Sequence, residues 1–278
     1  MRHLRGVSGL QASVIVRAKD RERTIGRTLE SLHRQTVRPE VIVVDSGSQD
    51  ATVSIARGAC DRLIEIPPEE FTFGHALNLG AEAASAPIHF ALSSHCAPER
   101  ADWIERALEH YARDDVAGAC GYDGLPRDGV PGGVVYQDLD MLRHDPFWGF
   151  TNHASSWRAE VWEKFPFDSA RAGAEDKEWA ARVLGAGYLI VLDPALDVAT
   201  DHRFAQGVLD FYRRQRRDTR WVAEFAGSEP YGVRDLLSDW WNVRPDTRSR
   251  ARIRLSPWHA ADVLGRYAGL RGAPGPRL

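Results

Sequence analysis

Short apolar runs alternate with segments of helical periodicity along the first half of this 278-residue sequence. Three of these runs end abruptly at polar or small residues, as buried strands do at turns: residues 12–16, 41–44 and 88–92. Between the first two runs, Ile25, Leu29 and Leu32 have the spacing of one buried helical stripe. Strands that alternate with helices predict an α/β fold, a mostly parallel, helix-flanked sheet with right-handed crossovers.

Composition narrows the class of protein. The net charge is −3, so we expect no nucleic-acid partner. The three cysteines are widely spaced and fit neither a disulfide framework nor a zinc ribbon, and no signal-peptide core follows Met1. These features predict a cytoplasmic protein. No run of about 18 apolar residues occurs, so we also expect no transmembrane segment.

The second half is less regular. Helices are expected at 158–165, 174–184, 204–225 and 260–270, with a strand at 188–192. Residues 123–133 are rich in Gly and Pro, which is typical of a lid or an acceptor wall. Because the composition shifts at Gly227, we expect one domain over residues 1–226 with an internal division near residue 121, and a helical C-terminal extension over 227–278.

The stretch Ser93-Ser94-His95-Cys96 comes directly after the apolar run at 88–92. In open α/β sheets, ligands bind just outside the carboxyl ends of the strands. We therefore expect Ser93, Ser94 and His95 to contact a ligand. His95 is the natural contact for a metal ion or a phosphate group.

Several short motifs then occur in an order that resembles family 2 inverting glycosyltransferases with the GT-A fold. The matching segments are Ser13 to Asp20, Val43 to Thr52, Gly74 to Ala81, Phe150 to Asn152, Gly173 to Trp179 and Asp201-His202. The resemblance covers roughly residues 12–225. Where the family usually has aspartates, this chain has Ser93-Ser94-His95-Cys96, which resembles the Asp-Ser-His-Cys of polypeptide N-acetylgalactosaminyltransferases without its Asp.

The resemblance implies a nucleoside-diphosphate sugar donor bound by residues 12–121, with the acceptor bound by residues 122–226. Asp45 ends a predicted strand, and its carboxylate could accept hydrogen bonds from a base or a ribose hydroxyl. The alternative is a turn residue that caps the Ser-Gly-Ser loop. The implied contacts of the nucleotide sugar are Arg17, Lys19, Asp20, Asp45, Ser48, Asn78, Ser93, Ser94 and His95.

The pair Glu175-Asp176 opens a predicted helix. Inverting sugar transfer needs a carboxylate that takes the proton of the acceptor hydroxyl, and a helix N-terminus keeps such a group ionised. The resemblance implies that Asp176 is this base and that Glu175 orients the acceptor. The alternative is that both acids only stabilise the helix dipole. Trp148 and Asn152 are the expected acceptor contacts.

The leaving diphosphate also needs stabilisation of its negative charge. His95 and His202, together with diphosphate oxygens, could hold Mn²⁺ or Mg²⁺, and imidazole suits Mn²⁺ better. Metal-independent activity is the alternative, because guanidinium groups match phosphate geometry. The arginines available for that role are Arg203, Arg213, Arg216, Arg217 and Arg220.

The function expected from these features is inverting transfer of a sugar to an acceptor hydroxyl, in envelope saccharide or secondary-metabolite biosynthesis. Two alternatives stay open. A nucleotidyltransferase that makes a sugar nucleotide should carry a Gly-rich loop after the first strand, and Arg17 to Arg23 contains no Gly. A non-catalytic sugar-nucleotide-binding relative would explain the missing aspartates. The Arg-rich stretch from Arg244 to Arg254 leaves open a peripheral membrane contact or a homodimer.

Overall fold

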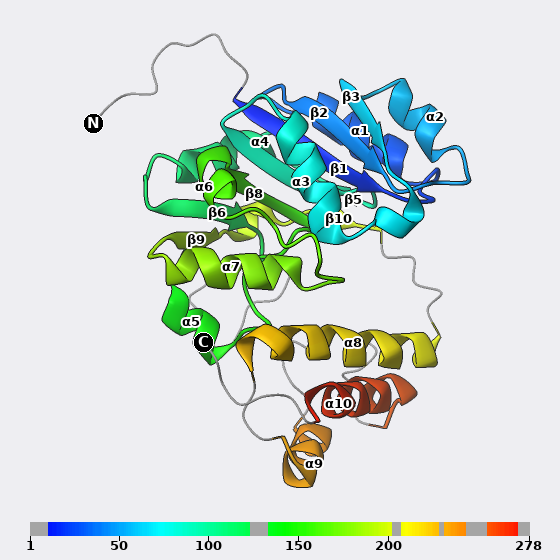
Figure 1. Ribbon diagram of the computed structural model, residues 1–278, viewed down its shortest axis with the longest axis vertical. Helices are drawn as coiled ribbons and strands as arrows, with labels where there is room; N and C mark the ends of the chain where they lie inside the picture. The colour runs from blue at the N-terminus through cyan, green and yellow to red at the C-terminus, as the bar shows by residue number, and fades with distance from the viewer. Residues whose placement is uncertain (1–10, 123–132, 202–206, 228–230, 243–254, 272–278) are drawn as a thin grey trace.

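The computed structural model describes residues 11–122, 133–201, 207–227, 231–242 and 255–271. Strands and helices alternate along the first of these segments, as Figure 1 shows. The strands are β1 (Ala12–Ala18), β2 (Glu40–Asp45), β3 (Arg62–Glu65), β4 (Ile88–Ser93), β5 (Cys96–Ala97), β6 (Val116–Cys120), β7 (Val135–Gln137), β8 (Ala154–Arg158), β9 (Leu189–Leu192) and β10 (Ala199–Thr200).

The α-helices are α1 (Ile25–His33), α2 (Thr52–Arg57), α3 (Phe73–Ala83), α4 (Trp103–His110), α5 (Leu139–His144), α6 (Ala159–Lys164), α7 (Glu175–Gly185), α8 (Val208–Ala226), α9 (Val233–Trp241) and α10 (Pro257–Leu270). Two 3₁₀ turns, η1 (Pro68–Glu70) and η2 (Pro194–Leu196), complete the described elements. No helix within these ranges is both long enough and apolar enough to cross a lipid bilayer.

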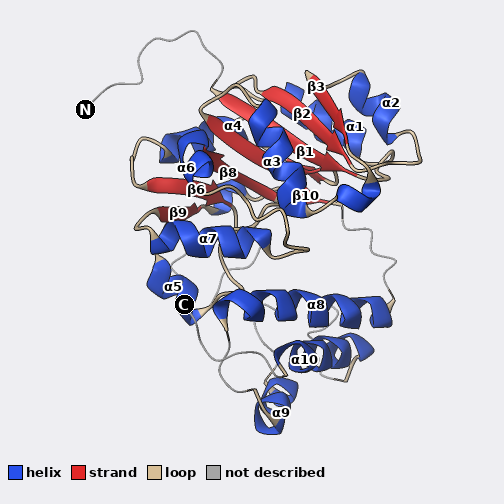
Figure 2. Ribbon diagram, in the orientation of Figure 1, coloured by secondary structure: helices blue, strands red, loops and turns tan. Residues whose placement is uncertain are grey.

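The described strands form one eight-stranded sheet and a separate two-stranded ribbon (Figure 2). The order in the large sheet is β3-β2-β1-β4-β8-β6-β9-β7. β1 pairs in parallel with β2 and β4, β2 with β3, and β6 with β9, whereas β8 and the edge strand β7 are antiparallel to their neighbours. The predicted α/β fold with a mostly parallel sheet is confirmed.

Helices cover both faces of this sheet. Successive strand residues point in opposite directions, so the apolar strands present apolar side chains on both faces. On one face, Val14 packs in a core cluster with Leu29 of α1 and Trp103 of α4. On the other face, Ile15 packs in a cluster with Leu77 of α3 and Trp179 of α7. Strands that are buried on both sides explain why the sequence shows continuous apolar runs rather than alternation.

The C-terminal helices pack beside the sheet domain rather than on its strands. In Figure 1, α8 lies between α7 and α10. α10 approaches α8 closely because Gly265 and Gly269 face it, and a Cβ on Gly269 would be 2.7 Å from the carbonyl oxygen of Arg216. The buried Asp262 of α10 accepts a hydrogen bond from Gln215 of α8. The predicted domain boundary at residue 226 stays a prediction.

Several elements differ from expectation. The helices expected at 158–165, 174–184 and 260–270 are confirmed as α6, α7 and α10, and the last one begins earlier, at Pro257. The helix expected from residue 204 is α8, which begins later, at Val208, directly after the extended Gly207. Most of the expected lid, residues 123–132, and the Arg-rich stretch at 243–254 lie outside the described residues.

Strand β8 was not predicted, although it lies in the middle of the sheet. Its sequence has no apolar run, and Ser155 and Ser156 are both buried. Buried hydroxyls are tolerated when they are hydrogen-bonded. Here Ser155 Oγ donates to Asn152 Oδ1 over 3.0 Å, and Tyr111 Oη donates to Ser156 Oγ over 2.8 Å.

Candidate active site

The carboxyl ends of β1, β2 and β4 meet at one edge of the sheet. In the parallel register, Ala18 pairs with Asp45, and Arg17 pairs with Ser93. The sheet therefore gathers, at one edge, eight of the nine residues that the sequence predicted for the nucleotide sugar. These are Arg17, Lys19, Asp20, Asp45, Ser48, Ser93, Ser94 and His95.

Hydrogen bonds join the loops after β1 and β2 into one surface. Asp45 Oδ1 accepts from the backbone N–H groups of Gly47 and Ser48, and its Oδ2 accepts from Ser48 Oγ over 2.5 Å. The backbone N–H of Asp20 donates to the same Ser48 Oγ, while Asp20 Oδ1 accepts from the N–H of Gln49. Asp45 thus caps its own loop as the alternative interpretation proposed, and a contact with a nucleoside stays a prediction. Lys19 is exposed beside this network.

Arg17 connects this edge to the Glu175-Asp176 pair. Its guanidinium donates to the carbonyl oxygen of Asn152 over 2.6 Å and lies 3.4 Å from Glu175 Oε1. It also lies over the ring of Phe73, with 5.3 Å to the centroid. The Arg17 and Glu175 side chains are only 10% and 7% exposed. Both side chains are therefore largely removed from solvent and lie in contact.

The N-terminus of α7 is held in place by the segment before β8. The backbone N–H of Asn152 lies 3.4 Å from Asp176 Oδ2, and its side-chain amide lies 3.4 Å from Glu175 Oε1. Lys177 Nζ donates to the carbonyl oxygens of Gly149 and Phe150. Ala174 takes a left-handed backbone conformation with φ of 55°, which turns the chain into the helix. Asn152 and the predicted catalytic pair therefore form one cluster.

The two acids of this pair have different surroundings. Glu175 is buried, whereas Asp176 is partly exposed at the helix start. Burial raises the pKa of Glu175 to about 7, and the negative charge of Asp176 adds to the shift, although the charge of Arg17 opposes it. Asp176 is the acid that solvent and an acceptor could reach. This difference fits a base at Asp176 and a buried support at Glu175.

The stretch that carries His95 lies against the chain at Asp201. β5 pairs with β10, where Cys96 is opposite Thr200, and the N–H of Asp201 donates to the carbonyl oxygen of His95 over 2.9 Å. The sheet also fixes this stretch from the other side, because the N–H of Ser94 donates to the carbonyl oxygen of Arg17. The residue after Asp201, His202, lies outside the described residues.

The described residues do not by themselves supply a metal site. Among them, no group of three or more His, Cys, Asp and Glu side chains could hold a metal ion. His95 on its own is a poor donor set for Mn²⁺ or Mg²⁺, which take mainly oxygen ligands at several positions. The predicted pairing of His95 with His202 stays a prediction.

Asn78, a predicted donor contact, and Trp148, a predicted acceptor contact, are packed among other residues. Asn78 donates to the carbonyl oxygen of Phe167 and to Ser169 Oγ, and its Oδ1 accepts from Trp162 Nε1 and from the N–H of Phe167. These bonds use the hydrogen-bonding capacity of the amide, so Asn78 ties α3 to the chain before α7. Trp148 is buried beside Tyr122, as a core residue would be, and its contact with an acceptor stays a prediction.

α8 also reaches this site. The Trp221 ring fills the space over Gly173, so no Cβ could be placed there, and Arg217 lies 4.8 Å from the centroid of the same ring. Gly173 immediately precedes the left-handed Ala174 and the acid pair. The long helix therefore supports the loop that presents Asp176.

The fold and this cluster define a class of protein. A mostly parallel, helix-flanked sheet carries polar residues on its first strand ends, and a carboxylate pair opens a helix at the same edge. The sheet and its helices have the architecture of the GT-A fold. Residues 13–125 match the model of the family described as Glycosyl transferase family 2.

Two curated glycosyltransferases are similar to parts of this chain. The chain is 24% identical over 194 residues to the O-antigen chain rhamnosyltransferase RfbN of Salmonella typhimurium, covering 63% of this chain and 62% of that protein. It is 37% identical over 103 residues to the glycosyltransferase AglE of Haloferax volcanii, covering 34% of each. The chain thus spans less than two thirds of the length of these relatives.

A solved structure shares the fold. The mannosyltransferase PcManGT from Pyrobaculum calidifontis, in complex with GDP-Man and Mn²⁺, aligns with a TM-score of 0.61 at 16% identity. The alignment covers 92% of this chain and 69% of that one. The likeness therefore extends beyond the matched family segment into the second half of the chain.

Proposed function

We propose that this protein is an inverting glycosyltransferase that moves a sugar from a nucleoside-diphosphate sugar to an acceptor hydroxyl. The observation that carries the proposal is the connection through Arg17 and Asn152. These two residues join the strand ends, where a donor would lie, to the pair Glu175-Asp176. One cluster thereby contains both a donor edge and a candidate base.

In the proposed reaction, the acceptor hydroxyl loses its proton to the Asp176 carboxylate. The acceptor oxygen forms a bond to the anomeric carbon from the face opposite the diphosphate. The bond between that carbon and the diphosphate oxygen breaks, and its electron pair leaves with the nucleoside diphosphate. Asp176 lies at the positive end of the helix dipole, and the held geometry supplies proximity.

The acceptor class is part of the proposal. RfbN is named an O-antigen chain rhamnosyltransferase, which supports a cell-envelope saccharide as the acceptor of this chain and a deoxyhexose as a donor to test. A cytoplasmic location is supported by Cys60, Cys96 and Cys120, which form no disulfide with one another. A peripheral membrane contact and a homodimer are further proposals about partners.

The base assignment is tested by Asp176→Ala. General acid–base catalysis contributes roughly 10²- to 10⁴-fold, so turnover should fall by about that factor while binding of the nucleotide stays nearly unchanged. The matched control is Glu178→Gln, which alters another first-turn acid of α7 that is paired with Arg182. Turnover of Asp176→Ala at the wild-type rate would show that another group takes the proton.

The same assays separate the two alternatives. A nucleotidyltransferase would release pyrophosphate from a nucleoside triphosphate and a sugar phosphate, and it would not consume a sugar nucleotide. A non-catalytic relative would bind the sugar nucleotide but transfer its sugar to no acceptor. The proposed enzyme should release a nucleoside diphosphate only when an acceptor is present.

A further inference from the structure

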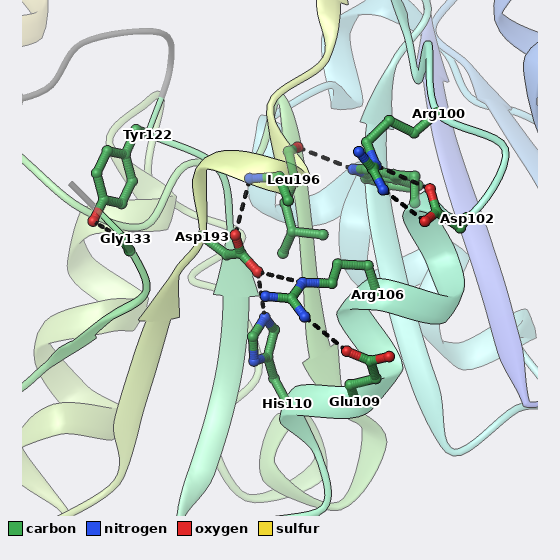
Figure 3. A network of polar contacts seen from close by, with 11 residues as sticks. Arg100, Asp102, Arg106, Glu109, His110, Tyr122, Gly133, Asp193 and Leu196 are labelled. Atoms are coloured by element: carbon green, nitrogen blue, oxygen red, sulfur yellow. Dashed lines mark hydrogen bonds and ion pairs between the residues drawn. The ribbon is translucent and has the colours of Figure 1, made fainter.

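Asp193 is a buried carboxylate that the proposed chemistry does not use. It follows β9 and is 3% exposed. Figure 3 shows Arg106 and His110 reaching it from α4, with Arg106 Nε and His110 Nε2 at 2.8 and 2.9 Å from Asp193 Oδ2. Burial alone would raise its pKa, but hydrogen bonds from Ala195, His110 and Arg106 outweigh that and hold the pKa of Asp193 below its usual range.

The same helix also fixes the chain that follows Asp193. Asp193 Oδ1 accepts from the backbone N–H of Ala195, which caps η2. At the end of η2, the carbonyl oxygen of Leu196 accepts from Trp103 Nε1 over 3.0 Å (Figure 3). α4 therefore holds η2 at both ends, through one charged cluster and one indole.

η2 leads within a few residues to the His95 region. β10 begins at Ala199 and pairs with β5, so that Thr200 lies opposite Cys96. The next residue, Asp201, donates its N–H to the carbonyl oxygen of His95. A two-residue pairing of this kind is too short to be stable alone, because short hairpin-like pairs need packing from other elements. The anchor on α4 supplies that support.

We propose that Asp193 is a positioning residue for the diphosphate end of the donor site. By holding η2 on α4, it keeps β10 in register with β5 and so sets the chain at Asp201 beside His95. The inference rests on the proposed function only in taking His95 as part of the donor site. Asp193 touches neither donor nor acceptor, and it acts through the position of the backbone.

Asp193→Asn tests this role with two measurements. Amide hydrogen exchange of residues 195–201 should become about tenfold faster, while exchange in β1, β2 and β4 stays as in the wild type. Calorimetric titration with UDP, GDP and dTDP should show affinity reduced by about tenfold, which corresponds to about 1.4 kcal/mol. In the transfer assay, KM for the donor should rise with little change in kcat.

The matched control is Asp102→Asn. Asp102 accepts two hydrogen bonds from Arg100 just before the same helix, and both side chains of this pair are exposed. This variant should leave exchange and nucleotide affinity unchanged. Arg106→Gln serves as a second, milder variant because it keeps the bond between His110 and Asp193. It should produce the same changes in exchange and affinity with a smaller amplitude. It also replaces Asp193→Asn in these measurements if that variant does not fold.

Four results would overturn the proposal. Unchanged exchange of residues 195–201 in the folded variants would show that Asp193 does not hold the segment. Faster exchange with unchanged nucleotide affinity would show that residues 195–201 do not affect the donor site. A fall in kcat with an unchanged donor KM would place the effect elsewhere. If the wild type bound none of the three nucleotides, the donor-site assignment itself would fail, and the proposal with it, while the exchange data would still report on the anchor.

Discussion

At the scale of single residues, the buried Glu175 lies in the candidate active site, and its raised pKa lowers the stability of the folded protein at neutral pH. Its pKa is raised to about 7, first by burial and then by the charge of Asp176. Between the ordinary value of 4.5 and about 7, the folded protein keeps a proton that the unfolded chain releases. The free energy of unfolding therefore falls as the pH rises through this window, by roughly 3 kcal/mol in total.

Glu175→Gln should remove this dependence because an amide does not ionise. We expect the variant to gain stability relative to the wild type between pH 4.5 and pH 8, by roughly 2–3 kcal/mol. Urea unfolding at both pH values measures the difference, and Glu178→Gln, which changes an acid paired with Arg182, provides the control. An equal difference between variant and wild type at the two pH values would mean that Glu175 titrates normally.

The sequence predicted the members of this cluster but not their connection. Arg17 directly follows the first apolar run, Asp176 lies at the start of a predicted helix, and both positions follow from local patterns. The bond from Arg17 to Asn152 spans 135 residues, and the pair with Glu175 spans 158. Contacts over such separations depend on the strand order, which single-sequence patterns do not contain. For the same reason, the sequence could not tell that the Asn78 amide bonds the chain before α7.

At the scale of elements, the contact between α8 and α10 depends on two glycines. A Cβ on Gly265 would lie 2.8 Å from Gln215 Cβ and 2.9 Å from the carbonyl oxygen of Tyr212. On Gly269, it would lie 2.7 Å from the carbonyl oxygen of Arg216. Backbone atoms cannot move aside as a flexible side chain can, so larger residues at these positions must push the two helices apart.

Gly265→Val should therefore destabilise the protein by roughly 1–3 kcal/mol or more, as overpacking does in well-packed cores. The control is Gly185→Ala at the end of α7, where nothing lies within 4 Å of the added Cβ. That change should be neutral or stabilising by up to roughly 1 kcal/mol. Thermal unfolding measures both, and a Gly265→Val protein as stable as the wild type would contradict the close packing.

Elements with strong apolar patterns were predictable, and those held by polar contacts were not. β1, β2 and β4 are continuous apolar runs, and α7 has a regular buried stripe through Trp179, Val183 and Leu184. β8 is held by buried serines that find partners only in the folded sheet. Edge strand β7 and the ribbon of β5 and β10 are too short to carry a pattern.

At the scale of the whole molecule, the proposed site is assembled from both halves of the chain. β1, β2 and β4 supply the donor edge, α7 supplies the acid pair, and Trp221 of α8 supports the loop at Gly173 that leads into α7. Binding of a nucleoside diphosphate should therefore stabilise the entire fold and not only its first half. The stability of the whole fold can also show whether a metal ion or arginine side chains stabilise the diphosphate.

A ligand that binds only the folded protein raises the free energy of unfolding by about 2.7 kcal/mol at a concentration 100 times its dissociation constant. For a chain of this size, that corresponds to a rise of roughly 5 °C in Tm. We expect such a rise with at least one of UDP, GDP and dTDP, and a further rise when Mn²⁺ is added. His95→Ala should lose the Mn²⁺-dependent part and keep the part due to nucleotide alone, while His144→Ala, at an exposed histidine of α5, should keep both. If Mn²⁺ added nothing and EDTA left transfer unchanged, the diphosphate would be stabilised without metal, and arginines of α8 such as Arg217 would become the residues to replace next.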